Sequence, residues 1–182
     1  IEVYTRLGYD VNRTEETESK QEYIDIDGIQ CVKASTTLTD TSDFSTQWGC
    51  IGQGETLASP IQLMMWQSAI ATQTGKAAVP YLIQYTTKVD GTPDNHAVTS
   101  VTEEFFTAQT AAYVRQIMLN NGQRYTSSIP GYTLGLKSGT AQVKDGAEEN
   151  SLLVGFDSNP EHPIAFCVLI EDRKSGEITT DS

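Results

Sequence analysis

The sequence contains few of the residues on which metal, redox and nucleic-acid chemistry depend. Only three cysteines and two histidines occur among 182 residues, with no C-x-x-C pair and no Cys/His spacing typical of a metal site. Twelve Lys and Arg residues stand against 24 Asp and Glu residues, which gives a formal net charge of -12 and a pI near 4.4. Such a charge repels nucleic acid and anionic membranes, so we expect neither as a direct partner.

Long apolar runs are missing as well. No stretch is long enough to span a bilayer, and no signal peptide is recognisable. The first residue is Ile1 rather than Met, so we expect a processed or excised piece of a longer protein. The absence of a spanning run in this piece therefore says nothing about an anchor elsewhere in that protein.

The composition that remains is typical of one soluble globular domain. Hydrophobic residues make up 38% of the chain and charged residues 20%, and this length is sufficient for a sizeable core. An odd number of cysteines leaves at least one free thiol. Cys167 lies in the apolar run IAFCVLIED and is predicted to be buried. Whether Cys31 and Cys50 form a disulfide is left open.

Two helices are predicted in the middle of the chain. Ser59 and Pro60 are typical of an N-cap and a first helical position, and apolar residues then continue on nearly every face until Gly75. This pattern predicts a buried helix over about 60–74. A second helix is predicted over about 101–120, with Ser100 and Glu103 as a capping box.

Three strands are predicted in the last third, near 131–143, 150–157 and 163–172. The turns between them are short, which favours antiparallel pairing. The last strand, PIAFCVLIED, is apolar on both faces, so we expect it to be covered on both sides. The fold class is therefore α+β, an antiparallel sheet packed on helices. We divide this single predicted domain into an irregular part with many loops (1–50), a helical part (51–122) and a three-strand part (123–182).

The first of these strands carries the motif Lys137-Ser138-Gly139-Thr140. If Leu134 and Leu136 face a core, the alternation of a strand turns Lys137 to the other side, toward a cleft. Gly139 would let a ligand lie close to the backbone. A lysine, two hydroxyls and a free strand edge suit a carboxylate at the end of an extended peptide, and the backbone N–H after the glycine suits an oxyanion. The alternative is a strand that simply ends in a polar turn.

Further matches surround this motif. Together they resemble the penicillin-binding transpeptidases, which cross-link peptidoglycan and are acylated by β-lactams. The family's K-[ST]-G motif, commonly K-T-G-T-A-Q, is here the segment 137–142. Its G-Q-G block, which favours a class B monofunctional transpeptidase, is here 52–54, and its T-P-L-Q block is here 59–62. The segment 6–10 (RLGYD) is similar to the one that follows the family's second motif, and the last two predicted strands are similar to its last two sheet strands.

The resemblance implies a β-lactamase/transpeptidase-like fold and a serine acyl transfer on D-Ala-D-Ala stem peptides, without cofactor or metal. It implies that Lys137 supports the catalytic network, that Ser138, Gly139 and Thr140 bind the substrate, and that the Thr140 N–H forms half of the oxyanion hole. The implied partners of the full-length protein are stem peptides and β-lactams. Its implied place is the extracytoplasmic cell envelope, with a transmembrane anchor N-terminal to this chain.

The chain also departs from the family pattern. No serine is followed by lysine three positions later, and no S-x-N or Y-x-N occurs, although the family needs both. We therefore expect the C-terminal part of a transpeptidase domain, without its nucleophile, inactive alone and prone to self-association through an uncovered sheet edge. The alternative is a non-catalytic module of similar fold that binds peptidoglycan or a protein partner. A serine β-lactamase or β-lactam sensor would leave the 52–62 blocks unexplained.

Overall fold

The computed structural model describes residues 1–11, 22–38, 43–174 and 176–180. Most of the predicted loop at 10–23 and part of the one at 35–47 lie outside these ranges. Within them, no helix combines the length and apolar character that crossing a membrane requires.

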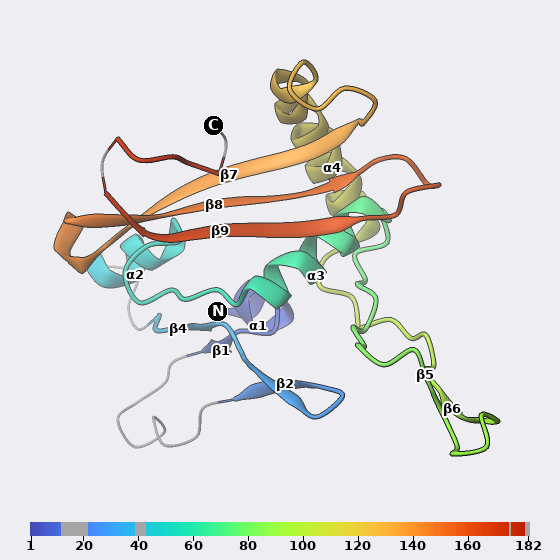
Figure 1. Cartoon of the computed structure of the whole chain (residues 1–182). Helices are drawn as coiled ribbons and strands as arrows, with labels where there is room; N and C mark the ends of the chain where they lie inside the picture. The colour runs from blue at the N-terminus through green and yellow to red at the C-terminus, as the bar shows by residue number, and fades with distance from the viewer. Residues whose placement is uncertain (12–21, 39–42, 175, 181–182) are drawn as a thin grey trace.

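An antiparallel sheet of three long strands lies along one side of the molecule (Figure 1). The strands β7 (Leu134–Val143), β8 (Glu148–Asp157) and β9 (Ala165–Arg173) follow each other in both sequence and space. In the register of the first pair, Lys137 lies opposite Val154. The predicted meander and the α+β class are therefore confirmed.

Two helices pack on one face of this sheet. α3 (Pro60–Ala71) lies against β8 and β9, and α4 (Ala108–Gly122) lies against β7. Their contact with the sheet forms a core around Ile70, Met118 and Phe156. Ser59 is the N-cap of α3 and Pro60 its first residue, as predicted, and every residue of α3 from position 61 onward is buried or half-buried.

The predicted start of the second helix is wrong. α4 begins at Ala108, and its N-cap is Thr107, whose side-chain oxygen accepts a hydrogen bond from the Thr110 N–H. Ser100 and Glu103 form no capping box, because they precede the helix by several residues.

The segment before α4 pairs with a distant part of the chain instead. Val101 forms a bridge with Ala78, and the Phe105 N–H donates to the carbonyl of Gly75. Gly75 has a positive φ of 72°, and a Cβ there would lie 1.7 Å from the Phe106 carbonyl oxygen. This close approach, made possible by glycine, satisfies the backbone of 101–106 without a helix.

Shorter elements make up much of the rest of the described chain. The N-terminal part contains α1 (Glu2–Arg6), α2 (Phe44–Cys50), the parallel pair β1 (Asp10–Val11) and β4 (Ser35–Thr36), and the hairpin β2 (Tyr23–Ile26) with β3 (Ile29–Val32). Asp27 and Gly28 turn that hairpin with positive φ values, as Asp-Gly turns do. A second hairpin, β5 (Tyr85–Thr87) with β6 (Pro93–His96), projects from the body in Figure 1.

The expectation that the last strand is covered on both sides is wrong. β9 is an edge strand, with Val168 45% exposed and Leu169 36% exposed. Val168 and Leu169 are neighbours and lie on opposite faces, so neither face of the strand is fully covered. No described strand pairs with the outer edge of β9. Cys167 on this strand is half-buried rather than buried, and its burial raises the pKa of the thiol. All three cysteines are free thiols.

Candidate active site

The Lys-Ser-Gly-Thr motif lies in the middle of β7, an edge strand of the sheet. Lys137 and Thr140 are exposed, while Ser138 and Gly139 are half-buried. The motif is therefore an accessible strand surface, whereas the alternative reading made it a polar turn at the end of a strand.

The side chain of Lys137 belongs to the face that carries the helices. A Cβ on Gly135 would lie 2.2 Å from Cζ of Phe156, and Phe156 packs against α3 and α4. Residues two apart in a strand share a face, so Lys137 and Gly139 lie on this face too. Lys137 thus lies on the face opposite Leu136, as the alternation predicted, but it is the face of Lys137 that carries the helices. Leu136 is also buried, but on the other face, against Gly155.

The backbone of β7 follows a strict alternation of its polar groups. The Thr133 carbonyl accepts from the Ser158 N–H at 2.9 Å, so odd-numbered residues bond to β8. The Leu134 carbonyl points instead at Gly122 of α4. In an antiparallel ladder the N–H and C=O of one residue point the same way, and successive residues alternate. Ser138 and Thr140 therefore present their N–H and C=O groups to the free edge.

Two side chains contact this free edge. Nζ of Lys137 donates to the carbonyl of Ser138, which holds the ammonium group at the edge. Nε2 of Gln53 donates to the carbonyl of Thr140 at 3.4 Å. Gln53 lies in the Gly52–Gly54 loop after α2. In the sequence this block was a family signature only, and no role was predicted for the glutamine. The contact joins residues 87 positions apart.

A pocket of about 370 Å³ extends from the motif toward the C-terminal end of β7. Gln53, Leu63 and Leu152 are among the residues that line it, together with Ala141, the residue next to Thr140. It thus lies between the 52–63 segment and the sheet, directly beside the motif.

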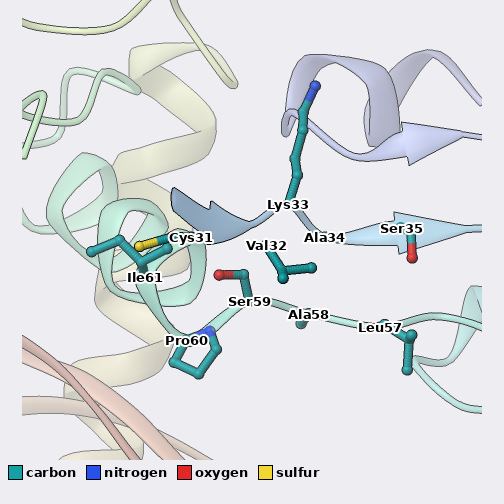
Figure 2. Close-up of a pocket in the computed structure, with 10 residues that line it drawn as sticks. All are labelled: Cys31, Val32, Lys33, Ala34, Ser35, Leu57, Ala58, Ser59, Pro60 and Ile61. Atoms are coloured by element: carbon teal, nitrogen blue, oxygen red, sulfur yellow. The ribbon is translucent and has the colours of Figure 1, made fainter. Parts of the chain in front are cut away.

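A second pocket, of about 440 Å³, lies elsewhere (Figure 2). It is lined by residues 31–35 and 57–61, mostly apolar, and it includes none of the motif residues. In Figure 2 Lys33 extends away from the other labelled side chains. Its volume is larger than that of the pocket beside the motif. It lacks convergent polar groups, however, and we do not assign it to the candidate active site.

The edge of β7 has the chemistry of an anion-binding surface. It brings together an ammonium group, two hydroxyls and two outward N–H groups, which suit a carboxylate and a developing oxyanion. It does not contain an activated nucleophile, because Ser138 and Lys137 have side chains on opposite faces of the strand. Among the described residues, no group of His, Cys, Asp and Glu is placed to hold a metal ion.

Comparison with protein families identifies the class of this fold and site. The family model described as Transpeptidase, the penicillin binding protein transpeptidase domain, matches residues 6–181. The chain therefore belongs to the penicillin-binding protein transpeptidase family. Comparison with curated proteins finds no match.

Solved structures of similar fold agree with this assignment. PBPA from Mycobacterium tuberculosis has a TM-score of 0.74 and 19% identity, over 93% of this chain and 39% of that one. PBP3 from the same organism, complexed with aztreonam, has a TM-score of 0.65 and 20% identity, over 96% and 40%. The D,D-transpeptidase domain of a peptidoglycan glycosyltransferase from Eggerthella lenta has a TM-score of 0.66 and 19% identity, over 95% and 42%. The chain thus spans about two fifths of the length of these structures.

Proposed function

We propose that the full-length protein is a class B D,D-transpeptidase that cross-links peptidoglycan by serine acyl transfer. The observation that carries the proposal is the free edge of β7, where Ser138 and Thr140 turn their main-chain groups outward beside the Lys137 ammonium group. Membership of the transpeptidase family supports it. PBPA from M. tuberculosis forms acyl-enzyme complexes with imipenem and penicillin G, which supports β-lactams as ligands.

Each motif residue has a role in this proposal. A stem peptide that ends in D-Ala-D-Ala lies extended along β7, and its terminal carboxylate accepts hydrogen bonds from the hydroxyls of Ser138 and Thr140. Gly139 allows the peptide to approach the strand closely. The Thr140 N–H donates to the oxyanion of the tetrahedral intermediate, and Lys137 supplies positive charge for the proton network. An amine of a neighbouring stem peptide then takes the acyl group from the serine.

The nucleophilic serine of this proposal comes from outside the 182 residues. No S-x-x-K or S-x-N occurs in the sequence, and a serine hydroxyl without an adjacent base is a weak nucleophile. The chain alone is therefore proposed to be inactive. We also propose that the full-length protein works in the extracytoplasmic cell envelope, held by an N-terminal membrane anchor.

The missing motifs also favour a second candidate, a non-catalytic module that binds peptidoglycan or a protein partner. Such a module would keep the fold and the β7 edge and would need no serine. The two candidates differ in one measurable property, covalent acylation by penicillin.

Intact-mass spectrometry after incubation with a fluorescent penicillin tests the proposal. The full-length protein should gain one adduct per chain, and the 182-residue chain should gain none. Lys137→Ala in the full-length protein should slow labelling about a hundredfold or more, the scale of losing one group that stabilises the transition state. Lys88→Ala, on the loop of the β5–β6 hairpin, is the matched control and should label at the normal rate. An unlabelled full-length protein would favour the non-catalytic module.

A further inference from the structure

We propose that the protein binds a small zwitterion, a dipeptide with apolar side chains, in a third pocket at the other end of the sheet. Two opposite charges line this pocket, the Arg115 guanidinium and the Asp157 carboxylate. Neither forms an ion pair in the described part of the chain. None of the motif residues lines the pocket, so the inference goes beyond the proposed function and does not depend on it.

The pocket lies where β8 ends and the β8–β9 turn meets the two helices. It has a volume of about 540 Å³, and its lining comes from the end of α3, the segment after it, one residue of α4 and both sides of the turn. In the register of the sheet, Asp157 lies opposite Leu134 at the start of β7, whereas residues 141–143 at the end of β7 line the pocket beside the motif. The two pockets are thus at opposite ends of the sheet.

Asp157 supplies the negative charge of this pocket. The residue is only 6% exposed, and its Oδ1 accepts a hydrogen bond from the Asn159 N–H. Its Oδ2 is buried and has no hydrogen-bond partner among the described residues, which is costly for an acceptor. The C-terminal end of α3, which carries partial negative charge, reaches the same pocket through Ala71 and Thr72. Both features favour an ammonium group at this position.

Arg115 supplies the positive charge. Its guanidinium carbon lies 5.8 Å from the centroid of the Phe156 ring. Its Nε is buried and, within the described ranges, has no hydrogen-bond partner. A planar guanidinium binds a carboxylate through two parallel hydrogen bonds, so a carboxylate is the ligand group that suits this side chain.

The size and the remaining lining of the pocket select a dipeptide. The volume of about 540 Å³ lies within the range of about 300–1,000 Å³ for small-molecule pockets. Ala78, Pro163 and Ile164 contribute aliphatic surface, which suits apolar side chains. Because Arg115 and Asp157 do not contact each other, a ligand that bonds to both needs separated charges. A dipeptide separates its ammonium and carboxylate groups by a peptide unit, whereas a single amino acid carries both on one carbon.

Isothermal titration calorimetry on the full-length protein tests the proposal with alanyl-leucine, in its L,L and its D,D form. The N-acetylated peptide lacks the ammonium group, and the peptide amide lacks the carboxylate. Each should bind about five- to tenfold more weakly than the free peptide, as expected for the loss of one hydrogen-bonded charge.

Two variants assign the two ends of the peptide. Asp157→Asn keeps one side-chain oxygen and should weaken binding of the free peptide by a similar factor, while the affinity for the N-acetylated peptide stays unchanged. Arg115→Gln should weaken binding of the free peptide and leave the affinity for the amide unchanged, which also shows that the variant is folded. The matched controls are Glu161→Gln, an exposed carboxylate in the β8–β9 turn, and Arg124→Gln, an arginine over the ring of Tyr125 outside the pocket. Both should bind all three peptides as the wild type does.

Three results would overturn the proposal: equal affinity for the free and the blocked peptides, wild-type affinity in both pocket variants, or no saturation by either form below about 10 mM. The last result is expected if Arg115 and Asp157 turn toward each other and form an ion pair. Lys137→Ala should leave the affinity unchanged, and a loss there would assign the binding to the motif instead. Failure of penicillin labelling would overturn the proposed function and would leave these titrations unaffected.

Discussion

Gly135→Ala should destabilise the protein, because Gly135 lies directly under the ring of Phe156. A Cβ at this position would come within 2.2 Å of Cζ and 2.7 Å of both Cε atoms of that ring. The ring is 0% exposed and packs between Ile70 and Met118, so it has little room to move. The substitution therefore overfills a closed core.

The expected decrease in the free energy of unfolding is the difference between two effects, the cost of overpacking and the gain from a less flexible unfolded chain. Overpacking of a core costs about 1–3 kcal/mol, and the upper end applies because three ring atoms would be too close. Replacing glycine by alanine returns about 0.4–1 kcal/mol by restricting the unfolded chain. The net loss is about 2 kcal/mol, which for a domain of this size lowers Tm by about 4–8 °C.

Urea and thermal unfolding, followed by circular dichroism, measure this loss. Gly139→Ala is the matched control on the same strand and face, since its Cβ would meet only Leu152 at an ordinary 3.9 Å. Its stability should stay within about 0.5 kcal/mol of the wild type. In a Phe156→Leu background, Gly135→Ala should cost much less, because the two changes share one contact. A Gly135→Ala protein as stable as the control would refute the β7–β8 register, and with it the placement of Lys137 on the helix-bearing face.

Two further predictions concern the periphery. The N–H groups of Ile83 and Leu82 donate to the Asp27 carboxylate and lower its pKa. This contact contributes above the unfolded pKa and is lost as pH falls through the lower, folded value. Asp27→Asn should therefore speed amide exchange at both positions at neutral pH, with no difference from wild type in strong acid. The 182-residue chain should also dimerise through β9, more strongly at high salt because its net charge of -12 is screened. Sedimentation should show that Val168→Lys prevents this, and a wild-type monomer at high concentration would contradict it.

The sequence was sufficient to predict the elements that local signals determine. Ser59 and Pro60 predict the start of α3, because serine is typical of an N-cap and proline of the first helical position. The three-strand meander follows from short turns between apolar runs. The start of α4 could not be predicted this way, because the backbone of 101–106 bonds to the segment after Gly75, some 25 residues earlier. The local pattern of a capping box at Ser100 therefore did not determine the structure, because hydrogen bonds to a distant segment formed instead.

The candidate site divides in the same way. The motif at 137–140 is visible in the sequence because its residue types are unusual together. The face of Lys137 could not be derived, since Leu136 and Phe156 are both buried and lie on opposite faces of the sheet. The Gln53 contact depends on the fold alone, because nothing in the local sequence links this loop to β7.

The outward main-chain groups of Ser138 and Thr140 have a consequence for how far the sequence of this site can diverge in evolution. A peptide N–H and its carbonyl are the same in every residue except proline, which has no N–H. Any substitution that keeps the strand extended therefore keeps half of the recognition surface intact. A site built in this way tolerates wide divergence in the residues around it, whereas a proline at Thr140, or an inserted residue that shifts the alternation, would erase it in one step.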